Sequence, residues 1–378
     1  MDISATPAWQ ALQRHRQALS SFRLDAALRE QPARSRSWRF EASGIEADLS
    51  RNLATDETWK LLLALADAAS LPRWRERLVA GEPINGTEGR PAWHTALRSA
   101  PADVTVARAV EQQRRRMLDF AGRLRAGEIK GATGKPIETV VCIGIGGSDL
   151  GPRLVTAALG EPSGPVRLHL VSNIDPTELD VALAGAAPET TLVVAISKSF
   201  TTLETLENAR AALAWLKSRA PALDARRHLA AITSQPERAQ AFGTDAALVF
   251  TFAEWVGGRY SVWSPCGLPI AVAHGPAAFD ELLRGAAALD RHFVEAPPAR
   301  NLPLLLGLLG VWYVNFWGCR SRAVIPYAQR LRHLPAYLQQ LEMESNGKRV
   351  DRDGAPLGYD TSPVVWGEAG TTAQHSVF

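Results

Sequence analysis

One six-residue stretch of this sequence concentrates groups that bind anions. It runs from Ser197 to Thr202, between a short apolar run that ends at Ile196 and a helical pattern over residues 203–219. A helix N-terminus offers free N–H groups and the positive end of a dipole, so this cluster can supply several donors to one phosphate. The alternative is helix capping, which needs only one such residue. We predict an anion site made by Ser197, Lys198, Ser199, Thr201 and Thr202.

A glycine-rich turn at residues 144–151 is the second candidate for holding a charged group. Its sequence, GIGGSDLG, lets the backbone approach a ligand closely, and Ser148 adds a hydroxyl near the start of a helix. The turn does not match the G-x-G-x-x-G nucleotide fingerprint, because Asp149 occupies the last glycine position. Gly147 and Ser148 are therefore candidates for a binding site. The alternative is that the turn is purely structural, as many glycine-rich turns are.

Three further residues carry reactive groups whose roles their neighbours alone do not settle. Arg259 follows the flexible pair Gly257-Gly258, where a guanidinium could face a ligand or form an ordinary surface ion pair. Glu344 lies just past a helical pattern and His375 lies far along the chain, and each by itself is typical of a structural residue. No histidines pair at metal-ligand spacing and no H-E-x-x-H occurs, so we expect no metal site.

Short apolar runs separated by helical patterns predict the scaffold that positions these loops. The runs cover residues 139–145, 166–171, 191–196, 228–232 and 247–252. Continuous β-branched runs alternating with helices indicate a parallel sheet covered on both faces, as in a Rossmann-like α/β domain. Ligand sites in such sheets lie beyond the carboxyl ends of the strands. Both loops follow the carboxyl end of a predicted strand.

The remaining sequence extends on both sides of this predicted sheet. Residues 1–101 have apolar positions at helical spacing and predict a helical N-terminal region. Residues 102–295 are the first α/β subdomain, and residues 296–378 begin a second one with too few elements to complete a sheet. In this second part we expect an apolar helix over 302–317, a short strand over 323–325 and a helical run through Leu341.

The composition limits the class of protein. Of 378 residues, 46% are hydrophobic and 21% are charged, which is typical of a globular protein and excludes disorder as the main state. A formal charge of +3, and the lack of aromatics among Arg114–Arg116, argue against a nucleic-acid or membrane-surface partner. The three cysteines are far apart, and the N-terminus lacks a signal-peptide core. We therefore expect a cytoplasmic protein with no membrane span.

Taken together, the segments resemble the phosphoglucose isomerase (glucose-6-phosphate isomerase) family. The matching stretches, in family order, are INGTEGRPAWHTALR at 84–98, GIGGSDLGP at 144–152, SKSFTTLET at 197–205, VGGRYSVWS at 256–264, LQQLEMESNGK at 338–348 and GTTAQHS at 370–376. The resemblance implies two sugar-isomerase-type (SIS) subdomains in a homodimer. It also implies reversible interconversion of glucose 6-phosphate and fructose 6-phosphate, in glycolysis and gluconeogenesis, without a cofactor.

The resemblance also assigns roles to residues. Gly147, Ser148 and the Ser197–Thr202 loop would hold the sugar phosphate, with Gln340 close to the sugar.

The catalytic roles follow from the same resemblance. Glu344 would be the base that moves a proton between C2 and C1 through an enediol, and Arg259 would stabilise the charge that develops. His375 would reach across the dimer to assist opening of the sugar ring. The roles are chemically reasonable, because removing a proton next to a carbonyl creates negative charge that a fixed cation stabilises.

The sequence also departs from the family pattern. Ser199 replaces the usual threonine, and Leu203 takes a place often held by glutamine. Family members continue well beyond the histidine motif and contribute an active-site lysine there, whereas this sequence ends at Phe378. We therefore expect an isomerase whose second subdomain is incomplete. A non-catalytic phosphosugar-binding module or an inactive isomerase fragment is the alternative.

Overall fold

The computed structural model describes residues 2–378 and divides the chain into two compact units. Unit 1 comprises Met1–Pro91, Arg284–Arg322 and Glu342–Val365. Unit 2 comprises Ala92–Leu283, Ala323–Leu341 and Trp366–Phe378. This division differs from the expected one, because the N-terminal region shares a unit with residues that were expected to begin a second subdomain.

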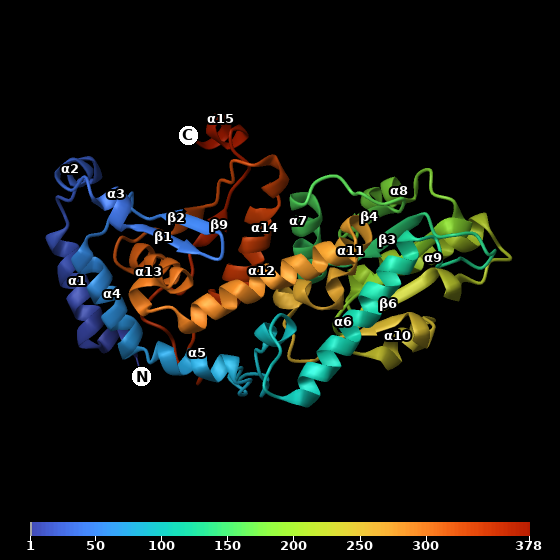
Figure 1. Ribbon diagram of the computed structural model, residues 1–378, viewed down its shortest axis with the longest axis horizontal. Coiled ribbons are helices and arrows are strands. Elements are labelled where there is room, and N and C mark those ends of the chain that lie inside the picture. The colour runs from blue at the N-terminus through green and yellow to red at the C-terminus, as the bar shows by residue number, and fades with distance from the viewer. Residues whose placement is uncertain (1) are drawn as a thin grey trace. The chain divides into compact units, whose positions relative to one another are not determined.

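A five-stranded parallel sheet is the centre of unit 2 (Figure 1). Its strands are β3 (Thr139–Ile143), β4 (Arg167–Val171), β5 (Thr191–Ile196), β6 (Leu229–Thr233) and β7 (Val249–Thr251). The strand order is β4-β3-β5-β6-β7, and every neighbouring pair is parallel. The predicted Rossmann-like α/β sheet is thus confirmed. Four of the five apolar runs contain a whole strand, and the run at 228–232 covers β6 except for its last residue, Thr233.

Helices follow each of the first four strands and cover the sheet. They are α7 (Leu150–Ala158), α8 (Pro176–Leu183), α9 (Leu203–Arg219) and α10 (Pro236–Phe242). Three more helices that belong wholly or partly to this unit are α6 (Val104–Arg125), α11 (Leu268–His274) and α12 (Pro276–Glu295). The predicted helix over 203–219 is confirmed at both ends. It could be predicted because apolar periodicity and a polar turn before the helix are features of the local sequence.

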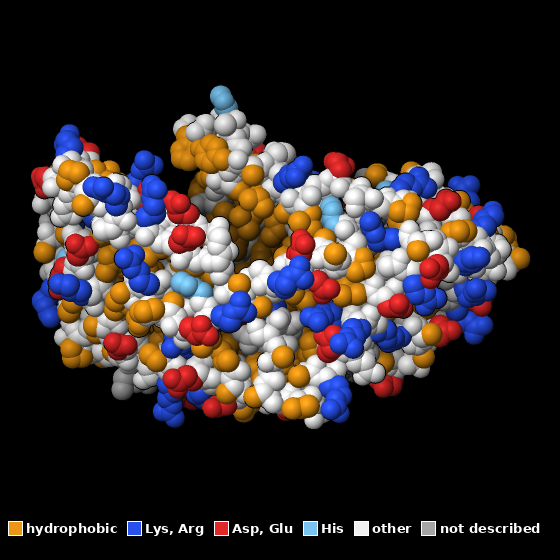
Figure 2. All heavy atoms as spheres, in the orientation of Figure 1, with side chains coloured by type: hydrophobic (Ala, Val, Ile, Leu, Met, Phe, Trp, Pro, Cys, Tyr) orange, Lys and Arg blue, Asp and Glu red, His pale blue; other side chains and the backbone are white. Residues whose placement is uncertain are grey.

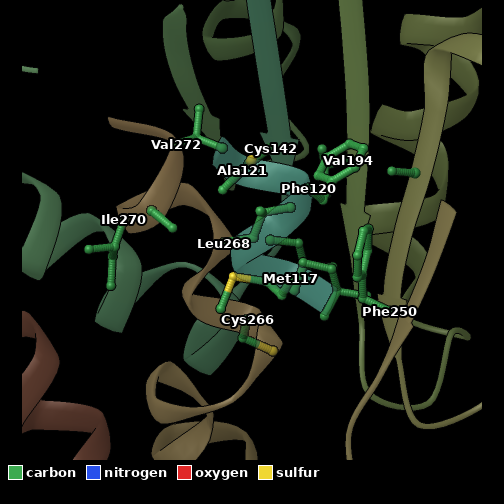
Figure 3. Packing of buried hydrophobic residues seen from close by; sticks show 14 of the residues in the cluster. Met117, Phe120, Ala121, Cys142, Val194, Phe250, Cys266, Leu268, Ile270 and Val272 are labelled. Carbon is green, nitrogen blue, oxygen red and sulfur yellow. The ribbon is translucent and has the colours of Figure 1, made fainter. Parts of the chain in front are cut away.

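Two hydrophobic clusters lie on opposite faces of this sheet. Val140 and Cys142 of β3 join one cluster, and Val141 and Ile143 join the other, as expected from the period of two in a strand. Figure 3 shows part of the first cluster, in which Met117 of α6 lies among residues from the sheet and α11. Burial on both faces explains why these strands are continuous apolar runs.

Unit 1 is mainly helical but contains a β-hairpin. Its helices are α1 (Pro7–Ala18), α2 (Leu24–Glu30), α3 (Arg34–Ser37), α4 (Asp56–Ala68), α5 (Leu71–Val79) and α13 (Leu302–Asn315). Strands β1 (Arg39–Ala42) and β2 (Ile45–Asp48) pair in antiparallel fashion, which the expectation of a helical N-terminal region missed. The turn between them has positive φ at Ser43 and Gly44.

The core of unit 1 explains why the expected domain boundaries differ from the structure. Helix α13 is apolar around most of its circumference, so it needs partners on several sides. Its fully buried Trp312 lies in one cluster with Trp9 of α1 and Leu62 of α4. The Trp312 indole N–H also donates to the carbonyl of Leu53 over 2.8 Å. The N-terminal region and residues 302–315 therefore share one core.

The remaining elements come from the region expected to begin a second subdomain. They are β8 (Ser321–Ala323), α14 (Leu334–Leu338), a π-helical turn (Gln339–Glu344), β9 (Val364–Trp366) and α15 (Thr372–Val377). Strands β8 and β9 form a two-stranded sheet, and β8 begins two residues before the expected strand. No helix among residues 2–378 is long and apolar enough to cross a membrane. On the face drawn in Figure 2, basic and acidic side chains are interspersed.

Candidate functional site

The two predicted loops begin side by side at the carboxyl edge of the sheet. Ile143 at the end of β3 pairs with Ala195 of the adjacent parallel strand β5. A Cβ at Gly144 would lie 3.2 Å from the carbonyl oxygen of Ile196 and 2.8 Å from the Cβ of Ser148. Glycine at this position therefore lets Ser148 pack close to the start of the second loop.

The glycine-rich loop also lies directly against the loop that carries Arg259. A Cβ at Gly147 would overlap the carbonyl group of Gly258 and would be 2.6 Å from the backbone nitrogen of Arg259. The buried Ser261 donates its hydroxyl to the Gly147 carbonyl over 3.2 Å. These contacts bring Gly147, Ser148 and the Arg259 backbone together in unit 2.

Gln340 is a further predicted residue that the structure brings to the glycine-rich loop. Gly146 has a positive φ of 60°, and its Cβ, if present, would be 2.9 Å from the Gln340 Nε2. The preceding helix α14 is anchored by Tyr337, whose ring carbon Cε2 would be 3.5 Å from a Cβ at Gly151. Burial raises the pKa of Tyr337 to about 12, so its hydroxyl is neutral at physiological pH.

The Ser197–Thr202 loop is a compact set of hydroxyl groups. The Ser197 side chain is 3% exposed, accepts a hydrogen bond from the Phe200 N–H over 3.1 Å and lies 3.0 Å from the Thr202 hydroxyl. The hydroxyls of Ser199 and Thr201 are 2.7 Å apart. Thr202 is the N-cap residue of α9 but makes no side-chain capping bond. Ordinary capping therefore does not account for the hydroxyls of this loop.

Lys198 ties this loop to the chain that follows β7. Its Nζ donates to the carbonyl of Glu254 over 2.7 Å and lies 4.0 Å from the Glu254 carboxylate. Its own carbonyl accepts hydrogen bonds from the Thr233 hydroxyl and the Ser234 N–H over 2.9 and 3.1 Å. The Lys198 backbone is thus fixed to the end of β6.

The sequence prediction missed Thr205, which lies in the first turn of α9. Its side chain is 2% exposed, and its hydroxyl has no hydrogen-bond partner within the described part of the chain. Buried polar groups are usually paired, so an unpaired hydroxyl beside the Ser197–Thr202 loop is an exception. The sequence signal was its spacing of three residues from Thr202, which places both on one helix face.

An aromatic support beside Arg259 was also missed. The guanidinium carbon of Arg259 lies 5.4 Å from the centroid of the Tyr260 ring. The Tyr260 ring also stacks on His94, with a centroid distance of 4.4 Å and an interplanar angle of 9°. The sequence contained a signal for this contact, because His94 lies in the stretch at 84–98 that resembles the family. That resemblance gave His94 no role.

Glu344 and His375 have different surroundings from the loops. Glu344 is exposed at the end of the π-helical turn that also carries Gln340, and its carbonyl accepts a hydrogen bond from the Lys348 Nζ over 2.6 Å. It belongs to unit 1, whereas Gln340, Arg259 and both loops belong to unit 2. His375 is exposed on α15.

A pocket of about 290 Å³ in unit 2 is separate from these residues. Its lining is mainly apolar and includes Leu97, Met117, Phe252, Trp255 and Trp263. None of the predicted site residues contributes to it. Among residues 2–378, no group of three His, Cys, Asp or Glu residues could hold a metal ion.

Comparison with known proteins gives consistent matches. Residues 48–378 match the family model described as phosphoglucose isomerase. The whole chain is 46% identical to the glucose-6-phosphate isomerase of Burkholderia ambifaria, covering 71% of that protein. The chain is also 47% identical to the glucose-6-phosphate isomerase of Pseudomonas fluorescens, in a match that covers 99% of the present chain and 69% of the Pseudomonas protein. The crystal structure of a glucose-6-phosphate isomerase from Chlamydia trachomatis is also similar, with a TM-score of 0.88 and 33% sequence identity. The match covers all of the present chain and 73% of the Chlamydia chain.

Proposed function

Because the chain belongs to the phosphoglucose isomerase family, we propose that it interconverts glucose 6-phosphate and fructose 6-phosphate through an enediol intermediate. The observation that carries this proposal is the packing of the Gly147 backbone against the loop of Arg259, beside the hydroxyl cluster of Ser197–Thr202. The reaction needs two binding features. A phosphate-binding loop holds the phosphate end of the substrate, and a cation stabilises the negative charge that develops at the carbonyl end.

The sugar phosphate would bind at the carboxyl edge of the sheet. Ser148 and the Ser197–Thr202 loop supply hydroxyl and N–H donors, and the N-terminus of α9 adds the positive end of its dipole. The four hydroxyls of this loop lie in two hydrogen-bonded pairs, so a phosphate can replace these pairings with charge-assisted bonds. The unpaired hydroxyl of Thr205 would gain a partner in the same way.

Proton transfer is the step assigned to Glu344. Its carboxylate would take the proton from C2 of the open-chain aldose, leaving an enediolate that gains a proton on O1. It would then return its proton to C1 while the proton on O2 leaves and the C2 carbonyl of the ketose forms, so that one proton moves from C2 to C1 and one from O2 to O1. Arg259 would stabilise the developing oxyanion, and Gln340 would contact the sugar. No electron acceptor enters this balance, because the substrate and product are isomers.

The proposal also includes the assembly and location of the protein. A homodimer would let His375, which is exposed on α15, reach the site of the second copy and assist ring opening. A cytoplasmic location is consistent with three free cysteines, two of which are buried.

The proposal is tested by turnover of fructose 6-phosphate in a coupled dehydrogenase assay with the purified chain. Glu344→Gln should lower turnover by roughly 10²- to 10⁴-fold, the usual contribution of a general base, and should leave inorganic phosphate affinity within about twofold. Glu295→Gln removes an exposed carboxylate at the end of α12 and is the matched control. Equal turnover in Glu344→Gln and the control would refute the assignment of the base. Phosphate binding without turnover in the unmodified chain would favour a phosphosugar-binding module.

A further inference from the structure

A buried carboxylate lies immediately after Ser148 in the glycine-rich loop. Asp149 is 5% exposed, and both of its carboxylate oxygens accept hydrogen bonds from the Nε of Arg153, over 3.0 and 2.9 Å. Arg153 also donates through NH2 to the carbonyl of Leu170 and to the Glu178 carboxylate, over 3.1 and 2.9 Å. One guanidinium therefore joins helix α7 to the end of β4 and to helix α8.

The network continues into the loop that follows β4. The second carboxylate oxygen of Glu178 accepts hydrogen bonds from the N–H groups of Ser172 and Asn173, over 2.7 and 3.0 Å. The buried side chain of Asn208 on α9 donates to the Asn173 carbonyl over 2.7 Å. The loops after β3 and β4 and helix α9 are thereby linked by hydrogen bonds at the carboxyl edge of the sheet.

The position of the Asp149 carboxylate matters for anion binding. Asp149 is the N-cap residue of α7, where an aspartate commonly accepts hydrogen bonds from the first-turn N–H groups. Here it makes no capping bond, because Arg153 holds its carboxylate. Because of this pairing, the Asp149 carboxylate does not accept hydrogen bonds from the first turn of α7. The Arg153 guanidinium also offsets the negative charge of Asp149, which is the residue after Ser148.

The charge balance of this cluster depends on Arg153. Burial raises the pKa of Asp149, and the bond and charge of Arg153 act against that rise. Burial also acts to raise the pKa of Glu178, but the N–H groups of Ser172 and Asn173, together with Arg153, lower it overall. Without Arg153, a buried carboxylate would be left unpaired, which is costly, and its charge would oppose the binding of a phosphate dianion.

We propose that Asp149, Arg153 and Glu178 are positioning residues that hold the glycine-rich loop ready for the sugar phosphate and keep the Asp149 carboxylate from repelling it. This inference rests on the proposed function, because it takes the glycine-rich loop as part of the sugar-phosphate site. It adds a determinant of substrate affinity that acts through other residues, without contact to the reacting carbons.

The test measures binding and turnover separately. In Arg153→Met we expect the dissociation constant for inorganic phosphate and the KM for fructose 6-phosphate to rise at least about tenfold, with kcat within about threefold. In Asp149→Asn/Arg153→Met both constants should return to within about threefold of the unmodified chain, because the Asp149 charge is gone and Glu178 keeps its hydrogen bonds from the Ser172 and Asn173 N–H groups. Arg123→Met is the matched control, since Arg123 pairs with Asp119 at the same helical spacing on an exposed face of α6.

A conservative variant keeps the test decisive if Arg153→Met does not fold. Arg153→Lys retains the charge but has one nitrogen in place of the two that bond Asp149 and Glu178. Its phosphate affinity should therefore be about threefold below that of the unmodified chain and above that of Arg153→Met. Unchanged phosphate affinity in both Arg153 variants would overturn the inference while leaving the proposed function intact. Equal losses in the single and double variants would overturn the role of charge. An unmodified chain that binds neither phosphate nor fructose 6-phosphate would overturn the proposed function itself.

Discussion

At the scale of single residues, hydroxyl groups distinguish this site from an ordinary helix start. The hydroxyls of the Ser197–Thr202 loop bond to one another in pairs, whereas the buried hydroxyl of the nearby Thr205 has no hydrogen-bond partner among residues 2–378. An unsatisfied buried hydroxyl costs folding free energy of roughly 1–3 kcal/mol. We infer that the fold tolerates this cost because a bound phosphate supplies the missing partner.

Replacing this hydroxyl should have opposite effects on stability and on binding. Thr205→Val should leave the free energy of unfolding of the unliganded protein unchanged or raise it by about 1 kcal/mol, because no buried donor is left unpaired. Its affinity for inorganic phosphate should fall by about tenfold, the value of one hydrogen bond of about 1.4 kcal/mol. Thermal unfolding with and without phosphate measures both effects.

Thr244 supplies the control for this prediction. Its hydroxyl is also buried and unpaired within the described residues, but it follows α10 and is not part of either loop. Thr244→Val should match the stability change of Thr205→Val and bind phosphate normally. A loss of phosphate affinity in both variants would contradict the assignment of Thr205 to the site.

At the scale of elements, glycines set how closely the loops approach. The Gly147 backbone meets the backbone of Gly258 and Arg259, so a side chain there has no flexible neighbour to displace. The loop after β3, the 3₁₀ helix that carries Arg259 (Gly258–Trp263) and the start of α7 must therefore shift together if Gly147 gains a Cβ. Such backbone contact fixes the main chain of Arg259 relative to the glycine-rich loop.

This packing predicts a specific sensitivity to one methyl group. Gly147→Ala should lower the free energy of unfolding by about 1–3 kcal/mol, as expected for overpacking, and should raise the KM for fructose 6-phosphate. Gly285→Ala is the control, because apart from the adjoining backbone of α12 nothing lies within 4 Å of the position of its Cβ, which is exposed. That control should be neutral or stabilising by up to about 1 kcal/mol in urea unfolding. Similar results for the two variants would show that the loops are not in rigid contact.

At the scale of the whole molecule, each unit contains histidines that are easier to protonate after unfolding. Burial is the main cause that lowers the pKa of His15 in unit 1 and of His169 and His333 in unit 2 below 6.5. Nearby arginines add to this effect for His169 and His333, whereas Glu57 opposes it for His15. The unfolded chain therefore binds more protons than the folded chain just below pH 6.5.

The consequence is a loss of stability on mild acidification. Stability from these groups is complete above about pH 6.5 and is lost as the pH falls from there toward the lower pKa values of the folded state. Calorimetry between about pH 7.5 and pH 5 should show a falling unfolding temperature over this window. His15→Gln should reduce the decrease, since a glutamine side chain does not titrate. A midpoint that rises on acidification would contradict the prediction.

Much of the fold and the family follow from local features of the sequence. Apolar runs predicted the sheet strands, and a polar turn before an apolar period predicted both ends of α9. Motifs in a fixed order were enough to indicate the family, because each motif is a contiguous string of residues. The loops at the carboxyl edge were also predictable, since each follows directly from its own strand.

The tertiary structure decided what depends on residues far apart in the chain. Only the folded chain shows that α13 shares a core with α1 and α4, because an apolar helix can be buried by any element of suitable shape. The hydrogen bond from Ser261 to Gly147 spans 114 positions, and no local pattern encodes it. Even the pair Asp149 and Arg153 had a sequence signal only for its helical spacing, while its burial and its links to β4 and α8 required the packed sheet.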